Sequence, residues 1–190
     1  MKVITTIILC FLITSGTLAQ DKFTVVQDSS TITVFGTSNA HDWETTTSSA
    51  EGTAILKFEN GGLLSVDSLS ITFLASSFKS GKKVMDKKTR GALNDKQHPT
   101  LQFELISIKS ISEDSIYAAG TFTVAGTSVE REVSVKYSAS PSGDIKFEGI
   151  APFKMTDFGI DPPTALLGSL KTGDDVDVQF KVLFNVANNL

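Results

Sequence analysis

The sequence predicts an all-β protein, because apolar and polar residues alternate with a period of two over most of the chain. The clearest run lies near the C-terminus, where one parity is apolar throughout: Val176, Val178, Phe180, Val182, Phe184 and Val186. The other parity is polar except for Leu183, as in an antiparallel strand with one face on a core and the other in water. Turn sequences separate further strand candidates at short spacing, which is typical of a sandwich or barrel. Several candidates are long and two-faced, which favours a closed antiparallel β-barrel without exposed edges.

The other strand candidates share this alternation or a β-rich composition, and turn residues bound them. They span residues 23–27, 31–35, 45–58, 63–74, 101–108, 121–124, 129–138 and 145–153. Hairpin turns are expected where glycine and polar residues cluster, at 59–62, 125–127 and 141–144.

One segment, residues 81–93, has helical spacing instead. Val84, Met85, Ala92 and Leu93 lie near one helical face, together with Lys88. Asn94 and the turn before Pro99 end the pattern. We therefore expect a single short helix packed over an opening or a side of the barrel.

The segment 153–174 is rich in large apolar residues but keeps neither strand nor helical periodicity. Pro162 and Pro163 have no N–H to give to a ladder, so the segment cannot be a central strand. Long apolar segments without regular structure are usually lids or binding loops. We expect an apolar crossover loop before the last strand, which either contacts a ligand or plugs the end of the barrel.

Residues 1–19 are predicted to be a cleavable signal peptide. Lys2 precedes an apolar run, Val3 to Ile13, that is too short to span a bilayer, and Ala19 ends a small-residue cleavage site. Cleavage after Ala19 would leave one domain, residues 20–190, in the periplasm or outside the cell. The only cysteine, Cys10, would be removed, which excludes disulfides and thiol chemistry in the mature chain.

The charge balance argues against a nucleic-acid binder, since 17 basic residues face 21 acidic ones. Basic residues nevertheless concentrate around the predicted helix, with only Asp86 and Asp95 of opposite sign between residues 79 and 98. They form either a solvated helix face or a rim that attracts an anionic head group or membrane surface. The rim candidates are Lys82, Lys83, Lys87 and Lys88.

Known catalytic motifs are missing from the sequence. There is no Gly-x-Ser-x-Gly elbow, and Ser80-Gly81-Lys82 lacks the first glycine of a phosphate-binding loop. With two histidines, a metal site would need carboxylates to complete it, and we predict no metal site, no cofactor and no catalytic residue. An enzyme would need titratable groups that converge in one cavity, and the candidates are His41, His98, Lys154 and Asp157.

Four motifs, in order along the chain, resemble the YceI-like family of bacterial lipocalin-like polyisoprenoid-binding proteins. They are Val34-Phe-Gly-Thr-Ser-Asn-Ala-His-Asp-Trp43, Ser80–Lys88 with Ala92–Phe103, Gly120-Thr-Phe-Thr-Val-Ala-Gly126 and Phe153-Lys-Met-Thr-Asp-Phe-Gly-Ile160. The resemblance covers about residues 23–184.

This resemblance implies an extended lipocalin-like barrel with an apolar tunnel that holds a long isoprenoid tail, in a secreted or periplasmic protein. The resemblance does not specify the head group, which could be that of a quinone, a polyprenyl phosphate or another amphiphile. The candidates that it implies for the tunnel lining or rim are Phe35, Trp43, Met85, Phe103, Met155, Phe158, Ile160 and Leu166. We therefore expect a non-enzymatic carrier of such a lipid, and the basic residues around the predicted helix suggest transient contact with a membrane surface. A barrel with a filled core that serves as an interaction module, and an enzyme acting on an isoprenoid, are the alternatives.

Overall fold

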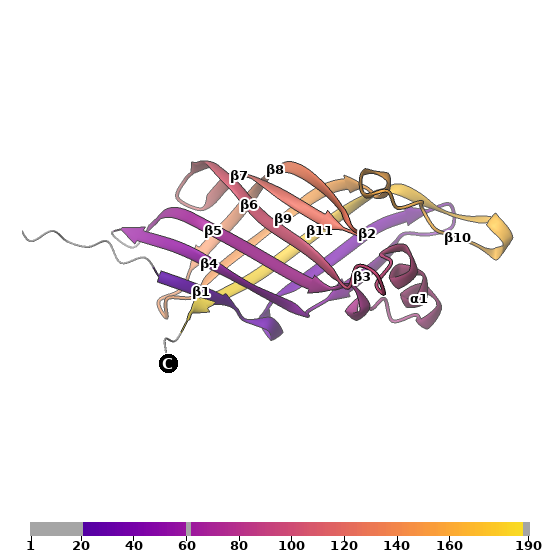
Figure 1. The fold of residues 1–190 in the computed structure, drawn as a ribbon, viewed down its shortest axis with the longest axis horizontal. Helices are drawn as coiled ribbons and strands as arrows, with labels where there is room; N and C mark the ends of the chain where they lie inside the picture. Colours follow the sequence, from indigo (N-terminus) through magenta and orange to yellow (C-terminus); the bar gives the residue numbers. More distant parts are fainter. Residues whose placement is uncertain (1–20, 60–61, 188–190) are drawn as a thin grey trace, which may run out of the picture.

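Eight antiparallel strands close into a barrel in the computed structural model, which describes residues 21–59 and 62–187 (Figure 1). The side chains of Ala165 and Leu166 and the predicted signal peptide lie outside this description. Around the barrel the strands are β1 (Asp21–Val25), β4 (Ala50–Glu59), β5 (Gly62–Leu74), β6 (Thr100–Ile111), β7 (Ser115–Val124), β8 (Thr127–Ala139), β9 (Ile145–Lys154) and β11 (Leu170–Val186). Pairing of β1 with β11 completes the ring. The prediction of an extended antiparallel barrel is confirmed.

The 17-residue strand β11 pairs with several other strands, and its two edges have different partners. One edge pairs with β9 from Asp175 to Phe184. The other pairs with β1 near the C-terminal end and with β2 (Thr31–Ser38) from Thr172 to Lys181. A further strand, β3 (Trp43–Thr47), extends the sheet beyond β2, and a bridge between Thr46 and Lys79 links it to the segment after β5.

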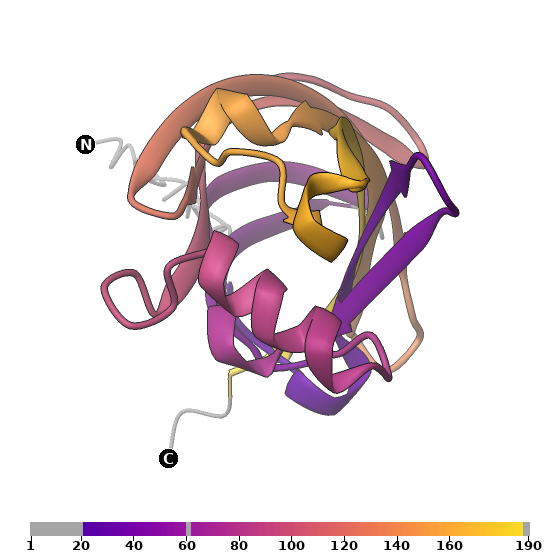
Figure 2. The same cartoon turned by 90° about the vertical axis from the view of Figure 1, so that its right-hand side faces the viewer.

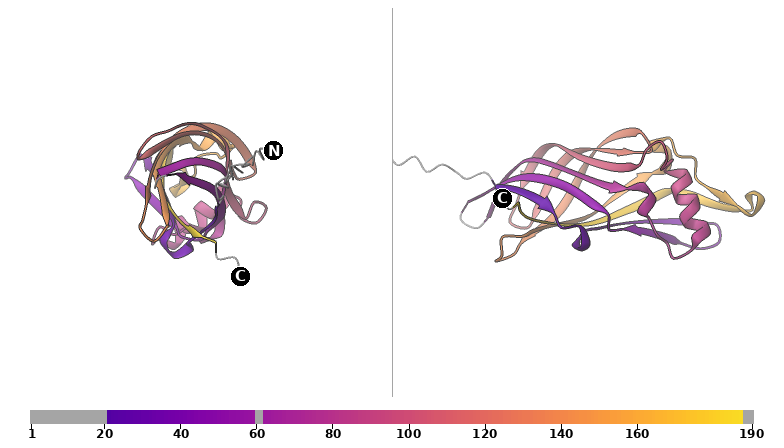
Figure 3. Two further views of the ribbon diagram at one scale, coloured as in Figure 1. Left: turned by 90° about the vertical axis from the view of Figure 1, so that its left-hand side faces the viewer. Right: turned by 60° about the horizontal axis from the view of Figure 1, so that its bottom comes forward.

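Helix α1 (Lys83–Ala92) and the segment between β9 and β11 lie across one end of the barrel (Figure 2). This segment contains the short elements η3 (Met155–Phe158), β10 (Thr164–Ala165) and η4 (Leu166–Gly168). Two other short 3-10 helices are η1 (Gln27–Ser29) and η2 (Ala75–Ser77). At the opposite end lie the start of β1 and the end of β11 (Figure 3). No helix in the described ranges is long and apolar enough to cross a membrane.

The strand predicted over 45–58 is wrong, because the chain changes partners within it. β3 pairs with β2, whereas β4 pairs with β1 and β5. Hydroxyl groups hold the break between them: Thr47 Oγ1 and Ser49 Oγ each lie 2.6 Å from Ser77 Oγ, and Ser49 Oγ accepts from the Leu74 N–H. Hydroxyls that bond to nearby backbone compete with ladder pairing in this way.

The predicted helix is confirmed, and a buried carboxylate fixes its start. Asp86 is 7% exposed and accepts hydrogen bonds from the Ser80 hydroxyl (2.6 Å) and the Ser80 backbone N–H (2.7 Å). These bonds lower the pKa of Asp86 below its ordinary value of 3.8. Because the folded-state pKa is lowered, Asp86 stabilises the fold above that value, and the contribution is lost as pH falls through the folded-state pKa.

Replacing Asp86 with Asn should therefore flatten the dependence of stability on pH at acid pH. The free energy of unfolding of the unmodified chain should fall between about pH 4 and pH 2, and Asp86→Asn should remove part of this fall. Urea denaturation at a series of pH values measures it, with the exposed Asp42→Asn as the control. Identical pH profiles for Asp86→Asn and the unmodified chain would contradict the assignment.

Candidate functional site

The barrel contains an internal cavity of about 490 Å³ whose wall is almost wholly apolar. Ligand pockets in proteins commonly enclose roughly 300–1,000 Å³ and are lined mainly by apolar side chains with a few polar groups. The inward faces of nearly all strands contribute, together with α1 and the segment after β9. The cavity therefore has the size and the lining of a binding site for an apolar or amphiphilic molecule.

The mouth of the cavity lies between α1 and the β2–β3 hairpin. His41, Lys82 and Val84 line the cavity and are also exposed, Val84 to 72%. Ser38 orders the hairpin, since its hydroxyl accepts from the backbone N–H groups of Ala40 and His41. This is the same end of the barrel that α1 crosses in Figure 2.

The opposite end is closed by a solid apolar core. Its largest members include Phe23, Leu56, Ile145 and Phe184, each at most 2% exposed, and none of them lines the cavity. The Phe147 and Phe184 rings meet edge-on with centroids 5.8 Å apart. Phe147 lines the cavity, so it forms part of the floor.

Three large rings pack over inward-facing glycines of neighbouring strands. Trp43 covers Gly36 and Phe180 covers Gly149, each its direct cross-strand partner, and Phe103 covers Gly120 diagonally. A Cβ at any of the three glycines would come within 2.1–2.7 Å of the ring. All three rings line the cavity. The absent side chains thus make room for rings that coat the wall.

A chain of phenylalanine rings continues this coat towards the mouth. Ring centroids are 4.8 Å apart for Phe103 and Phe122, 4.9 Å for Phe122 and Phe153, and 5.3 Å for Phe153 and Phe158. Offset and edge-to-face contacts of this kind stabilise the fold beyond the apolar area that they bury. They attach η3 to the wall, so Met155, Phe158 and Ile160 line the cavity.

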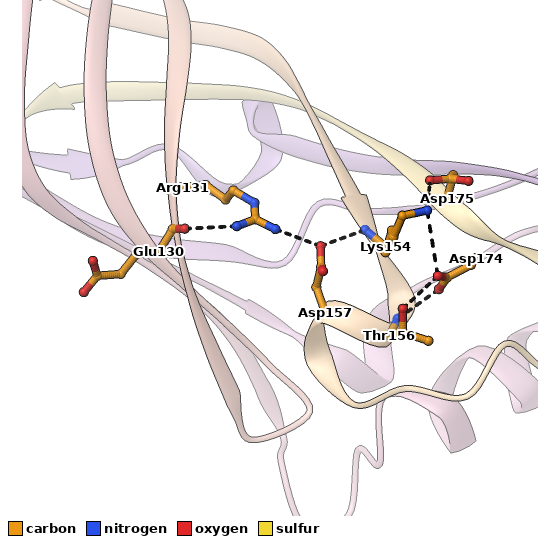
Figure 4. Close-up of polar contacts among 7 residues, drawn as sticks. All are labelled: Glu130, Arg131, Lys154, Thr156, Asp157, Asp174 and Asp175. Carbon is orange, nitrogen blue, oxygen red and sulfur yellow. Dashed lines mark hydrogen bonds and ion pairs between the residues drawn. The ribbon is translucent and has the colours of Figure 1, made fainter.

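A polar network on the other side of η3 fixes its position (Figure 4). Asp157 accepts from the Lys154 backbone N–H (3.1 Å) and from Arg131 (3.0 Å). The Thr156 backbone N–H (2.9 Å) and hydroxyl (2.7 Å) donate to Asp174 and lower the pKa of that carboxyl. The Asp175 carboxylate, 2.6 Å from Lys154 Nζ, raises the pKa of Lys154. Gly159, at φ 68°, ends the turn in the left-handed region that favours glycine.

Most of the lining candidates named from the sequence lie at the cavity wall: Trp43, Met85, Phe103, Met155, Phe158 and Ile160. The prediction that Phe35 lines the cavity is wrong, because its side chain is not part of the cavity wall and is 37% exposed. It has the opposite parity to Ile32 and Val34, which do line it, and successive strand side chains point to opposite faces. The side chain of Leu166 lies outside the described residues. Whether the six wall residues bind a ligand stays a prediction.

The four lysines of the predicted rim separate into two pairs. Lys82 and Lys88 line the cavity, whereas Lys83 and Lys87 are exposed and do not. Lys88 lies on the inward face of α1, and its ammonium donates to the carbonyl oxygen of Thr164, which ties α1 to β10. Helical spacing explains the separation, because residues 85, 88, 89 and 92 share one face.

The titratable groups that an enzyme would need do not converge. Of His41, His98, Lys154 and Asp157, only His41 lines the cavity. The ring of His98 packs against Gly126, and Lys154 and Asp157 belong to the network around η3. Within the described ranges no group of three or more His, Cys, Asp or Glu side chains is placed to hold a metal ion.

Sequence reasoning missed two features of the wall. The glycines at 36, 120 and 149 sit at inward parity in strands that otherwise carry large residues there, and this spacing was a usable signal. Thr45 also lines the cavity, but a threonine in a strand carries no signal of its own.

These features define a closed antiparallel barrel with an apolar cavity open beside a helix. Residues 23–184 match the family described as the YceI-like domain, and the chain belongs to this family. No curated protein is significantly similar to the chain in sequence.

Solved structures with the same fold include BcnA of Burkholderia cenocepacia, with a TM-score of 0.69, 19% identity, and coverage of 84% of this chain and 98% of that one. A polyisoprenoid-binding domain from Saccharophagus degradans, implicated in plant cell wall breakdown, has a TM-score of 0.69, 12% identity, and coverage of 87% and 98%. The YceI protein of Campylobacter jejuni has a TM-score of 0.57, 18% identity, and coverage of 72% and 81%. At these identities the likeness establishes the fold.

Replacing Gly36 with Ala should push Trp43 off the wall. The new Cβ would lie 2.1–2.8 Å from three atoms of the indole, whose N–H donates to the Thr37 carbonyl oxygen at 2.9 Å. We expect a loss of roughly 1–3 kcal/mol in the free energy of unfolding, as for other overpacked sites. The emission spectrum of Trp43, the only tryptophan, should shift as well. Gly91→Ala, which meets no atom within 4 Å, is the control. An unchanged spectrum and stability for Gly36→Ala would contradict the packing account.

Proposed function

We propose that this protein binds and carries an isoprenoid-type lipid with an anionic head group, without catalysing a reaction. The observation that carries the proposal is an apolar cavity whose charged lining side chains, among the described residues, are Lys82 and Lys88, both basic and beside its mouth. His41, the other ionisable lining residue, is also at the mouth, and no carboxylate of the described residues lines the cavity. Membership of the YceI-like family and the polyisoprenoid-binding structural relative support the isoprenoid tail.

The tail would supply most of the affinity. Burial of one methylene contributes on the order of 0.8 kcal/mol, so one isoprene unit contributes roughly 3 kcal/mol before the costs of association. A few units along the wall would be sufficient for tight binding. Few polar groups are then needed, and those at the mouth would orient the head group.

The cost of an empty cavity favours this proposal over a barrel that serves only as an interaction module. At ~24 cal/mol per Å³, an apolar volume of 490 Å³ that stays unfilled costs up to about 12 kcal/mol. That upper bound is comparable to the whole net stability of a typical domain. Larger side chains at the three inward glycines would have removed the space, so a ligand is the better explanation for it.

Lipid extraction tests the proposal directly. The full chain should be expressed with its N-terminal segment in a bacterial host and recovered from the periplasm or medium, the location that we propose. Mass spectrometry of the organic extract should detect an isoprenoid lipid bound at about one per chain. Empty protein in repeated preparations, with no uptake of added geranylgeranyl monophosphate or isoprenoid quinone, would refute the proposal.

The two pairs of lysines make the head-group assignment testable. Lys82→Gln with Lys88→Gln should weaken binding of geranylgeranyl monophosphate roughly tenfold, because it removes charge-assisted hydrogen bonds. Binding of the neutral geranylgeraniol should change little. Lys83→Gln with Lys87→Gln is the matched control, for which we expect at most about a twofold effect, since exposed charges are screened. Equal effects of the two double variants would refute a head-group role for Lys82 and Lys88 and would indicate that all four lysines belong to a solvated helix face.

We propose that the outer pair acts instead in transient contact with a membrane during loading. Lys83 and Lys87 are exposed beside Val84, and Leu167 is fully exposed in η4 at the same end of the barrel. Lys83→Gln with Lys87→Gln should lower cosedimentation with vesicles rich in phosphatidylglycerol, by attraction worth about 1 kcal/mol per lysine. Unchanged cosedimentation at low salt would rule this role out.

A further inference from the structure

The cavity ends at a defined depth inside the barrel, and the strand register marks this depth. On β9 and β11 the innermost cross-strand pair that lines the cavity is Phe147 with Val182. The next pair, Ile145 with Phe184, is fully buried in the core and lines no part of the cavity. Phe147 therefore lies at the boundary, because its ring packs against the Phe184 ring and also lines the cavity.

Strand β8 has its boundary at the same level. Val135 lines the cavity, whereas Tyr137, at the same parity and directly opposite Phe147, does not. The Tyr137 hydroxyl donates to the Ser112 carbonyl oxygen at 2.8 Å, which ties this ring to the turn between β6 and β7. The floor is thus built from several strands and is held in place from behind.

The depth of the cavity corresponds to a short isoprenoid tail. On β11 every inward residue from Val176 to Val182 lines the cavity. This stretch is roughly 20 Å long and, at the usual strand tilt, spans about 15 Å along the barrel axis. An extended chain advances roughly 1.2 Å per single bond, so an isoprene unit, with its four main-chain bonds, is about 5 Å long. The closed part of the barrel thus accommodates about three units.

The volume of the cavity gives the same answer independently. At ~30 Å³ for each group the size of a water molecule, a cavity of about 490 Å³ holds roughly 16 carbon atoms, which is about three isoprene units. Leu170 and Thr172 line the cavity further out, at the mouth, where about one more unit can lie.

We infer that the cavity selects isoprenoid tails of about three to four units and that Phe147 sets this limit. Each unit up to the limit buries apolar surface and strengthens binding. Any further unit would either stay in water or push the head group away from Lys82 and Lys88. This inference rests on the proposed function and adds the length of the tail to it.

A length series of prenyl monophosphates tests the limit in the full chain, each in competition with a fluorescent lipid. The affinity should rise at least about tenfold from geranyl to farnesyl monophosphate. From geranylgeranyl to geranylfarnesyl and hexaprenyl monophosphate it should rise at most about twofold, because the added units find no wall.

Replacing Phe147 with Ala tests the role of this residue. The change removes about as many carbon atoms as one isoprene unit contains, so it should lower the floor by about one unit. We expect the affinity for geranylfarnesyl relative to geranylgeranyl monophosphate to increase about three- to tenfold. The milder Phe147→Leu should change this ratio in the same direction but less. Phe35→Ala, which removes the same atoms from an outward ring, is the matched control and should keep the unmodified ratio.

Two results would overturn the inference alone. One is an affinity that rises as steeply beyond geranylgeranyl monophosphate as below it. The other is an unchanged ratio in Phe147→Ala, or in Phe147→Leu if the alanine variant shows no cooperative unfolding transition. Equal losses for all tail lengths would mean that the ring is only structural. An unmodified chain that binds none of the prenyl monophosphates would overturn the proposed function as well.

Discussion

The structure depends on one long strand that closes the barrel. β11 hydrogen-bonds to β9 along one edge and to β1 and β2 along the other, so each part of its length joins two different portions of the sheet. Closure leaves the ring without a free edge and gives every inward side chain of β11 a place in the interior. Val176, Val178, Phe180 and Val182 therefore line the cavity, while Phe184 belongs to the core that closes the far end.

Closure alone would allow the interior to fill with side chains, as in many small barrels. In this barrel, large inward-facing aromatic rings line the wall and leave the centre open. Inward glycines at 36, 120 and 149 accept the rings of Trp43, Phe103 and Phe180, and η3 is held at the rim by aromatic contacts on one side and carboxylates on the other. The space that remains is the apolar cavity in which we propose that the lipid tail lies.

Alternation and composition were sufficient to predict the barrel, the helix and the irregular loop, because a period of two or of 3.6 residues is itself a consequence of which face is buried. The break between β3 and β4 could not be predicted, since it depends on Ser77, a residue distant in sequence that bonds to Thr47 and Ser49. Phe35 was misplaced for a different reason: an aromatic residue in a strand signals burial, although the alternation of Ile32 and Val34 with Thr31 and Thr33 puts Phe35 on the other face.

The decisive measurement is a crystal structure of the full chain with geranylgeranyl monophosphate. We expect the phosphate between α1 and the β2–β3 hairpin, near Lys82 and Lys88, and the tail along the wall with its end near Phe147. A lipid bound outside the barrel, or inside it with the phosphate against the core at the far end, would refute the proposed binding mode.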